Sequence, residues 1–412
     1  MGWPRRELVI KVKTATPLLV GYYTPEKVDP MGLRTTEIKG IWRWWARAFV
    51  AGVLFDNNLL KGSRSQGVLL KPSPSDVKLI SMYLDKMGLG YSIGGRSSAS
   101  RFIIRVKTNG FSNISYFSRR SNTRQRIKLL TLNRGLEYIR ENIHFTIEVW
   151  KRMEKDRLAE DTALRILLAA IQLSGLGKGG RRGLGSLDIV SIDRSDLMEG
   201  SFKDLVKRIY SSIEELVKQE ESLHTSQLQD TTTRIPPLSL VSRRFIVIGK
   251  DSYALSHIHW VYRIRFDDMH NFFIRPNRCR VLTGRPVCND RLRSNHSAWI
   301  LGLPRGRGLR GSSTGYIITS TSITRRASPI MFTYHTSANK YGAGVFLSIF
   351  ISGDWPRQLV WFSGSGSKRL IQINIDRLLS AYSDLYGELN QYLERVTGVK
   401  DILYNRGSRI WP

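Results

Sequence analysis

The first part of the chain alternates between the two-residue period of strands and the wider spacing of helices. Residues 7–13 alternate, with Leu8, Ile10 and Val12 on one face, which predicts a strand. From Thr36 the apolar positions recur at steps of three and four, and Thr35 or Thr36 can cap the predicted helix. The apolar stripe of that helix consists of Ile38, Ile41, Trp45, Phe49 and Val53.

The same patterns continue to about residue 223. Residues 56–100 are rich in Ser and Gly and predict irregular structure, and the basic stretch 119–134 predicts a hairpin or loop. The resulting order of strand, helix, strand, strand, helix, strand is the ferredoxin-like βαββαβ pattern, which also underlies the RNA-recognition fold. The further strands are predicted over 101–107, 143–150 and 187–192, and the helices over 161–174 and 202–223.

A second copy of this pattern fits the rest of the chain. The fold class is therefore α+β, with two ferredoxin-like (RRM-like) domains that carry insertions. Polar residues and paired prolines mark 225–237 as the linker between a domain over 1–224 and another over 238–412. Strands are predicted over 244–248, 261–266, 315–319, 330–335 and 345–351, and a helix over 374–396.

The charge of the chain points to a polyanionic partner. Of 412 residues, 64 are Lys or Arg and 34 are Asp or Glu, a formal net charge of +30. Such an excess repels itself unless a polyanion offsets it, and nucleic acid is the obvious candidate. The apolar runs are too short for a bilayer span, and the N-terminus lacks the apolar region of a signal peptide. Cys279 and Cys288 form no disulfide framework and no zinc spacing, so we expect a cytoplasmic protein without cofactor or metal.

A glycine- and arginine-rich segment, residues 175–186, is the strongest candidate for phosphate contact. Glycine lets backbone N–H groups approach a phosphate, and neighbouring cations supply the charge. It is not a P-loop, because no Gly-Lys-Ser/Thr opens a helix, and the alternative is a flexible turn with solvated charges. The predicted RNA-binding residues here are Lys178, Gly179, Gly180, Arg181 and Arg182.

The helix that starts near Thr36 carries a basic stripe. Lys39, Arg43 and Arg47 are spaced by four and share one face, which predicts contacts to phosphates. Trp44 lies off the apolar stripe and is a candidate for base stacking, although tryptophans more often pack in cores or interfaces.

A second Gly/Arg-rich segment lies in the C-terminal half. Residues 304–311 and the Arg-Arg-Ala-Ser-Pro stretch that follows at 325–329 predict a further RNA-binding surface, with a solvated basic loop as the alternative. Its candidate residues are Arg305, Arg307, Arg310, Arg325 and Arg326.

These motifs resemble a RAMP protein of a type III CRISPR effector complex. The glycine-rich loop 177–186 is the hallmark of that family. More specific are the residues Thr16-Pro17-Leu18, Leu33-Arg34 and the run from Glu37 to Arg47, which together with 325–329 resemble the Cmr (type III-B) subunit at the 3′ end of the guide RNA. Through this resemblance Arg34 joins the candidate RNA-binding residues.

The resemblance implies two ferredoxin-like domains that face each other in a cytoplasmic ribonucleoprotein. The implied partners are the crRNA, the target RNA and neighbouring RAMP subunits. The implied role is to hold the 3′ region of the guide and help the complex capture target RNA, without cutting it.

Ribonuclease activity is the alternative, because some RAMP relatives cut RNA. An aspartate in a comparable loop of RAMP backbone subunits takes part in metal-dependent cleavage. Asp29 lies in the loop after the first strand, but the loop 21–33 has a different character here. Metal-assisted cleavage generally needs more than one oxygen ligand. His257 and His259 would share one face of a strand, but two ligands are too few for zinc, and we expect a structural role for them. No catalytic residue is therefore predicted.

Overall fold

The computed structural model is a mixed α+β structure built on two four-stranded antiparallel sheets. Among the described helices, none combines the length and apolar composition needed to span a bilayer. The described residues are 3–24, 26–30, 32–93, 96–108, 114–117, 135–220, 239–273, 280–282, 285–287, 291–303, 315–318, 326–337, 342–363, 366–405 and 407–412.

The first sheet has the strand order β10-β1-β9-β6. The chain between β1 and β6 contains two helices and the chain between β9 and β10 contains one, so the predicted βαββαβ arrangement, with an insertion, is confirmed for the N-terminal half. The main elements are β1 (Arg5–Thr14), α1 (Thr35–Asp56), β6 (Phe102–Thr108), β9 (His144–Lys151), α4 (Arg157–Leu173) and β10 (Leu187–Ile192).

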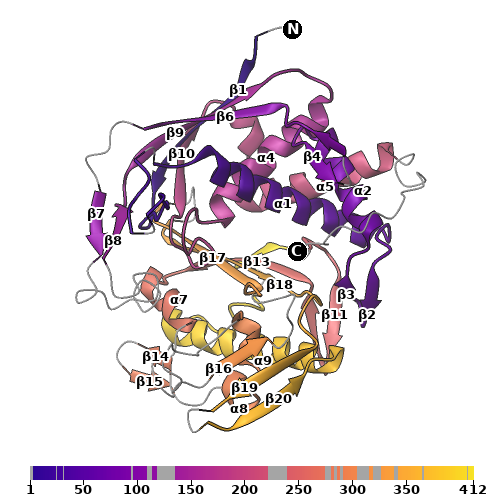
Figure 1. Cartoon of the computed structure of the whole chain (residues 1–412), viewed down its shortest axis with the longest axis vertical. Coiled ribbons are helices and arrows are strands. Elements are labelled where there is room, and N and C mark those ends of the chain that lie inside the picture. The colour runs from indigo at the N-terminus through magenta and orange to yellow at the C-terminus, as the bar shows by residue number, and fades with distance from the viewer. Residues whose placement is uncertain are drawn as a thin grey trace.

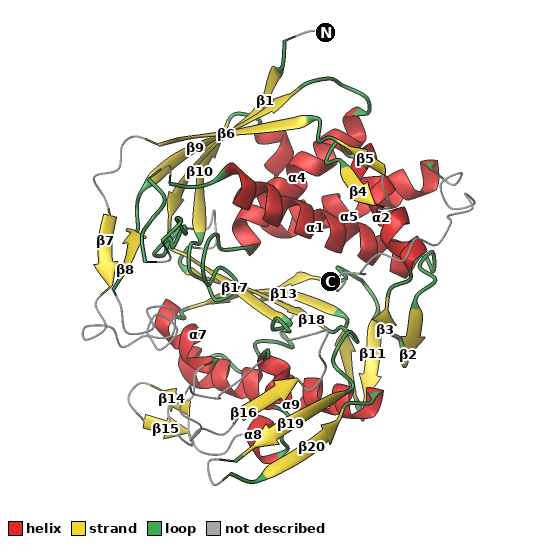
Figure 2. Cartoon of the chain, viewed as in Figure 1, coloured by secondary structure: helices red, strands yellow, loops and turns green. Residues whose placement is uncertain are grey.

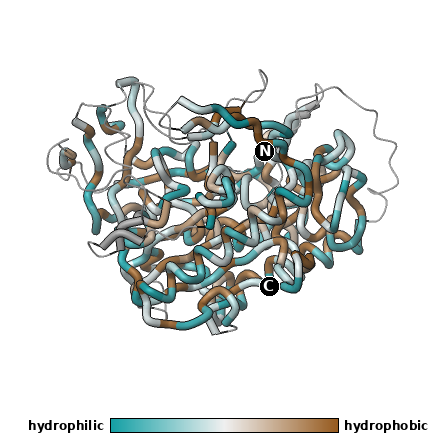
Figure 3. The backbone as a smooth tube through the Cα atoms, turned by 90° about the horizontal axis from the view of Figure 1, so that it is seen from below, coloured by the Kyte–Doolittle hydropathy of each residue, from teal (hydrophilic) through white to brown (hydrophobic). Residues whose placement is uncertain are grey.

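The alternation of β1 separates a buried face from an open one. Leu8, Ile10 and Val12 are fully buried, whereas the residues between them are partly or fully exposed. Helices α1 and α4 cover the buried face, and α5 (Phe202–Gln219) packs on both of them (Figure 1). Hydrophilic and hydrophobic residues alternate over short distances along the chain, as half-buried elements require (Figure 3).

The segment 56–100 is not irregular, so that prediction is wrong. It contains helix α2, whose N-terminus is a capping box: the Asp76 amide donates to the Ser73 hydroxyl over 3.1 Å, and the Ser73 amide donates to the Asp76 carboxylate. The smaller elements of this half are β2 (Ser63–Ser65), β3 (Val68–Lys71), α2 (Pro74–Lys86), β4 (Tyr91–Ile93), β5 (Arg96–Ser98), β7 (Ile114–Phe117), β8 (Leu136–Ile139) and the 3-10 helix η1 (Ser195–Met198).

The second sheet has the order β17-β18-β13-β21, which is again the ferredoxin-like arrangement. The second copy of the fold is therefore confirmed. Its main elements are β13 (Ser256–Tyr262), α7 (Phe266–Phe272), β17 (Ile330–His335), β18 (Gly344–Phe350), α9 (Ile375–Thr397) and β21 (Arg409–Trp411).

The strand predicted over 261–266 is misplaced. The observed strand β13 begins at Ser256, and Phe266 already starts α7. Strand β13 is central in the second sheet and is buried along almost all its length, so His257 and His259 lie inside the sheet. The predicted linker 225–237 and the stretch 119–134 lie outside the described residues. The remaining elements are β11 (Phe245–Ile248), β12 (Asp251–Ala254), β14 (Arg280–Leu282), β15 (Arg285–Val287), α8 (Arg291–Ser294), η2 (Ala298–Leu301), β16 (Gly315–Ile318), β19 (Gln358–Phe362) and β20 (Lys368–Gln372).

The helices of the first half lie between the two sheets, and α9 lies on the far side of the second sheet (Figure 1). Aromatic pairs join the layers: the rings of Trp45 and Phe350 are 5.8 Å apart, and those of Phe202 and Phe346 are 4.5 Å apart. The buried side chains of both halves form one hydrophobic cluster. Each half therefore supplies part of the other's core.

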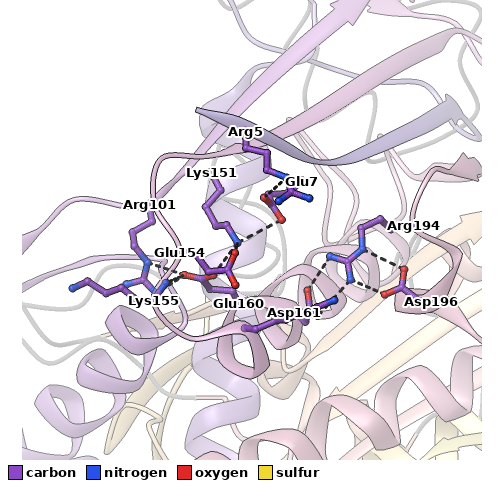
Figure 4. Close-up of polar contacts among 11 residues, drawn as sticks. Arg5, Glu7, Arg101, Lys151, Glu154, Lys155, Glu160, Asp161, Arg194 and Asp196 are labelled. Carbon is purple, nitrogen blue, oxygen red and sulfur yellow. Dashed lines mark hydrogen bonds and ion pairs between the residues drawn. The ribbon is translucent and has the colours of Figure 1, made fainter. Parts of the chain in front are cut away.

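A buried ion-pair network fixes the start of α4 against the first sheet (Figure 4). The Glu160 carboxylate lies 3.0 Å from the Lys151 ammonium and 3.1 Å from the Arg101 guanidinium. The Glu160 side chain is 2% exposed and those of Lys151 and Arg101 are 8% exposed. Lys151 also lies 3.5 Å from the Glu7 carboxylate and 3.4 Å from that of Glu154, so several acids share the compensation of these buried cations.

Candidate nucleic-acid interface

The glycine-rich loop, Gly175–Ser186, connects α4 to β10 and folds onto the loop that follows β1. The Lys178 amide donates to the Leu19 carbonyl, and the Gly185 amide to the Pro17 carbonyl, each over 2.9 Å. A third bond, from the Leu176 amide to the Gly185 carbonyl, closes the loop on itself. These bonds favour a defined backbone shape over the alternative of a flexible turn.

Two glycines in this loop are required by close approaches of the backbone. Gly177 has a φ of 71°, and a Cβ at this position would lie 2.5 Å from the Leu19 carbonyl oxygen. A Cβ at Gly175 would lie 2.1 Å from the Leu184 carbonyl oxygen. At these two positions glycine is explained by contacts within the protein, without reference to a ligand.

The two arginines of the loop reach into the C-terminal half. Arg182 donates to the carbonyls of Ile330, over 3.2 Å, and Leu301, over 3.0 Å, and its guanidinium lies 3.6 Å from the centre of the Phe273 ring. Arg181 donates to the Ser328 carbonyl over 2.9 Å. Both side chains therefore bind backbone oxygens of the other half, which gives them a role in joining the halves.

Arg181 is also the link between the loop and Trp44. Its guanidinium lies 5.5 Å from the centre of the Trp44 ring, and burial lowers the pKa of Arg181 to about 10. The half-buried Trp44 ring packs edge-on against Trp45 and Phe350, at 5.0 and 5.7 Å. Packing between the halves, which was the alternative to base stacking, accounts for these contacts of Trp44.

Lys178 takes a different direction from the two arginines. Its half-buried side chain runs along Gly21, since a Cβ there would lie 3.2 Å from the Lys178 Cε. Burial lowers the pKa of Lys178, and the nearby Glu26 opposes that shift. Among the predicted cationic residues of the glycine-rich loop, Lys178 is the one whose side chain lies against the loop that follows β1.

Substitution of Lys178 tests the loop as a phosphate site with little risk to the fold. We expect Lys178→Ala to leave the free energy of unfolding within about 1 kcal/mol of the parent, as for most partly exposed positions. Loss of one phosphate contact would lower the salt slope of binding to single-stranded RNA by about 0.7. Fluorescence anisotropy titrations at several salt concentrations measure this slope, with Lys207→Ala on α5 as the control; unchanged affinity and slope for Lys178→Ala would rule the contact out.

The basic stripe of α1 runs from exposed to half-buried positions. Arg43 is exposed and donates to the Gly90 carbonyl over 3.0 Å. Burial, followed by the charge of Arg43, lowers the pKa of Arg47. Lys39 is partly exposed. The three cations thus share one face of α1, as their spacing predicted. That they contact RNA stays a prediction.

The start of α1 differs from the prediction. The N-cap residue is Arg34 rather than Thr35 or Thr36, and no side chain caps the helix. The Arg34 guanidinium forms a close ion pair with the Asp29 carboxylate, and Asp29 is 6% exposed. This pair ties the loop after β1 to the first turn of α1.

The second predicted Gly/Arg surface is described only at Arg326. Its guanidinium donates to the Asp354 carboxylate over 2.7 Å and to the Ser352 hydroxyl over 2.8 Å. It also lies 4.8 Å from the Trp355 ring centre, and its side chain is 12% exposed. These contacts give Arg326 a place in the packing of the C-terminal half. Arg305, Arg307, Arg310 and Arg325 lie outside the described residues.

Exposed tyrosines near the glycine-rich loop were not predicted as site residues. Tyr23 is 82% exposed, and its ring lies 4.3 Å from that of Tyr22. Tyr116 on β7 is 59% exposed. Lys27, which binds Glu137 on β8 over 2.6 Å, lies close enough to Tyr116 and Tyr23 for both to affect its pKa. The signal in the sequence was a Tyr-Tyr pair within a polar, proline-containing loop, where a core role is unusual.

The histidine pair on β13 is buried in the second half. His257 is 5% exposed and His259 is fully buried, and their facing ring nitrogens are 3.2 Å apart. Burial, reinforced by Arg409, lowers the pKa of His257 to about 3, so the ring is neutral at physiological pH. Within the described part of the chain, no group of three or more His, Cys, Asp or Glu side chains is arranged to hold a metal ion.

A comparison with protein families gives a match for most of the N-terminal half. Residues 11–188, which run from β1 to the start of β10, match the profile of the RAMP superfamily. The similarity to the RAMP superfamily is therefore a property of this segment. The match contains the glycine-rich loop and the whole of α1, so the predicted RNA-binding residues from Arg34 to Arg182 all lie within the RAMP segment.

The fold is also similar to that of a chain in a solved type III-B complex. A chain of the structure described as "Cryo-EM structure of the Type III-B Cmr-beta bound to cognate target RNA" superposes with a TM-score of 0.50 at 14% identity, covering 93% of this chain and 100% of that one. Cmr1 from Pyrococcus furiosus, in its apo form, has a TM-score of 0.45 at 17% identity, with 91% and 96% covered. No curated protein matches the sequence. The first of these similarities in fold thus covers both ferredoxin-like halves and not only the segment matched by the family profile.

Proposed function

We propose that this protein is a non-catalytic RNA-binding subunit of a CRISPR type III-B (Cmr) effector ribonucleoprotein. In this proposal it acts in the cytoplasm in antiviral defence, binds the 3′ region of the crRNA, and aids the capture of target RNA. Its protein partners would be the neighbouring RAMP subunits of the complex. The observation that carries the proposal is a formal charge of +30 on a chain whose first half matches the RAMP superfamily.

The excess of cations supports an RNA ligand more strongly than any single side chain does. Arg181 and Arg182 donate to backbone carbonyls and Arg326 pairs with the Asp354 carboxylate, so all three side chains have partners within the protein. The predicted residues that we propose for phosphate contacts are Lys178 and the stripe Lys39, Arg43 and Arg47. Sequence recognition would then be left to base pairing with the guide, because phosphate contacts carry no base information.

The alternative, a RAMP-superfamily endoribonuclease that cuts precursor or target RNA, finds less support. The Asp29 carboxylate is held by Arg34 and is nearly buried. His257 and His259 are neutral and lie inside the second half. The residues that were weighed for catalysis are therefore occupied by contacts that stabilise the fold.

Incubation of the purified protein with labelled RNA distinguishes the two functions. We expect binding without cleavage, with or without Mg²⁺ or Mn²⁺. For a site of about six or more phosphate contacts, affinity is expected to fall on the order of 1,000-fold between 50 and 200 mM salt. Denaturing gels detect cleavage and filter binding measures affinity. Cleavage that disappears in Asp29→Ala would establish the nuclease instead.

A further inference from the structure

The open face of the first sheet carries an excess of positive charge. Helices α1 and α4 cover one face only, and within the described part of the chain no helix lies on the other (Figure 2). The register places Lys11 of β1 beside Thr146 of β9, and Thr146 beside Lys107 of β6. Side chains at directly paired positions share a face. Lysines from two strands therefore stand in one row across the sheet.

The neighbouring positions continue this cationic face. Lys13 lies two residues along β1 from Lys11, and Arg105 lies two residues along β6 from Lys107. Glu148, the acid paired in register with Arg105, forms an ion pair with Lys107 over 2.6 Å. Asp188, which is paired in register with Lys13, is fully buried and lies 2.9 Å from His335. Lys11, Lys13 and Arg105 thus add accessible charge that Glu148 alone does not balance. A solvated strand face usually mixes both signs, so this distribution favours an anionic ligand.

A flat aromatic surface lies on the same face. Trp150 of β9 is half-buried, and the Arg105 guanidinium lies 4.9 Å from the centre of its ring. The Trp150 indole N–H donates to the Glu148 carboxylate over 3.3 Å, which fixes the ring in place. Guanidinium and indole groups are the planar groups on which unpaired bases stack. The face therefore offers contacts for bases as well as for phosphates.

A pocket of about 400 Å³ opens where this face reaches the edge strand β10. Its lining combines apolar and polar side chains, and Val190 in its wall is 50% exposed. A volume of this size lies in the range of small-ligand sites. The lining residues are Lys13, Asn142, His144, Ile189, Val190 and Ser337.

We propose that the open face of the first sheet binds single-stranded RNA. The phosphates follow Lys11 and Lys13 along β1, a base stacks at Arg105 and Trp150, and the pocket at the β10 edge holds one nucleotide. Alternate residues of a strand are about 6.8 Å apart, comparable to the separation of neighbouring phosphates in an unstacked strand. This inference rests on the proposed RNA-binding function and adds a surface that lies apart from the glycine-rich loop.

The double variant Lys11→Ala/Lys13→Ala tests the surface. The probe is a fluorescein-labelled oligouridine, and anisotropy titrations on the full chain are run at several salt concentrations. We expect roughly a tenfold loss of affinity and a salt slope lower by about 1.4, as for two lost contacts to a single strand. Lys207→Ala/Lys218→Ala on α5 removes the same charge from exposed positions elsewhere and is expected to bind like the parent.

A pair of variants at Trp150 tests the stacking contact. Trp150→Phe keeps an aromatic ring and is expected to retain most of the affinity, whereas Trp150→Leu is expected to lose at least fivefold. Thermal unfolding confirms that both variants are folded at the assay temperature. Duplex RNA of the same length is expected to bind without this dependence on Trp150, because its bases are not free to stack.

The outcomes separate this inference from the function on which it rests. If the parent binds oligouridine and Lys11→Ala/Lys13→Ala behaves like the α5 control, the sheet face is not the site, and the RNA-binding function stands. If both double variants weaken binding equally, the effect is one of net charge, and the inference is again overturned. If the parent binds no RNA at all, the function and the inference fail together.

Discussion

Replacing Asp188 by alanine is expected to destabilise the protein by about 3–5 kcal/mol, because it removes the acceptor of several buried hydrogen bonds. The Asp188 carboxylate lies 2.9 Å from the His335 Nδ1, and neither side chain is exposed. His335 also places its Nε2 2.9 Å from the Gln172 carbonyl oxygen. The carboxylate further accepts bonds from the backbone amides of Thr336 and Ser337. Its loss would leave several buried donors without an acceptor.

Urea denaturation of Asp188→Ala and of the control Asp193→Ala measures this cost. Asp193 lies just after the same strand and accepts one bond, from the Val9 amide, at an exposed position, so we expect less than about 1 kcal/mol for its removal. A loss below about 1 kcal/mol for Asp188→Ala as well would mean that the pair does not hold the halves together.

The Asp188–His335 pair also predicts how the stability of the protein changes with pH. Burial opposes ionisation of Asp188, but the bonds from His335 and Thr336 outweigh it and hold the pKa of Asp188 below its ordinary value. A carboxyl whose pKa is lowered by folding stabilises the protein above its unfolded pKa of about 3.9, and that contribution is lost as the pH falls through the folded pKa. The difference in stability between the parent and Asp188→Ala is therefore expected to narrow below about pH 4.

Replacing Arg182 by alanine is expected to cost about 3 kcal/mol. The variant loses two hydrogen bonds from a charged group to carbonyl oxygens and the contact of the guanidinium with Phe273. Arg182→Lys is expected to recover only part of this loss, because an ammonium lacks the planar fork that reaches both Ile330 and Leu301. Differential scanning fluorimetry ranks the variants, with Lys178→Ala as the matched control in the same loop.

The result at Arg182 also decides how RNA-binding data on this loop are to be interpreted. If Arg182→Ala is less stable, a fall in RNA affinity reflects the displaced loop and is no evidence of a phosphate contact. If instead Arg182→Ala keeps the stability of the parent and loses affinity, the guanidinium binds RNA directly, and its contacts to Leu301 and Ile330 contribute little.

The sheets were predictable because their strands have one buried face. In β1 the alternation is strict, and β10 and β17 were placed at their observed bounds. Where this periodicity is weak, prediction failed. Helix α2 has only a short apolar stripe, and its clearest sign was the capping box that begins at Ser73 in a Ser- and Gly-rich stretch. In β13 both faces are buried, so no alternation marked its start.

The candidate site was predictable in composition but not in its contacts. A sequence shows that Arg181 and Arg182 are flanked by glycines and that the chain is basic. It cannot show whether a guanidinium meets a phosphate oxygen or a backbone carbonyl, since both are acceptors of similar geometry. The acceptors of Arg182 lie more than 100 residues further along the chain, and only the packing of the two halves brings them together.

The attachment of the glycine-rich loop to both halves has a consequence for how this protein folds. Backbone amides of the loop donate to carbonyls of the residues after β1, and its two arginine side chains donate to carbonyls of the C-terminal half. The hydrogen bonds of this loop can therefore form in full only when both halves are present. We therefore expect the two ferredoxin-like units to fold as a single cooperative unit. Either one produced alone would expose unpaired carbonyls and apolar surface, and apolar surface exposed in this way makes a chain prone to aggregation.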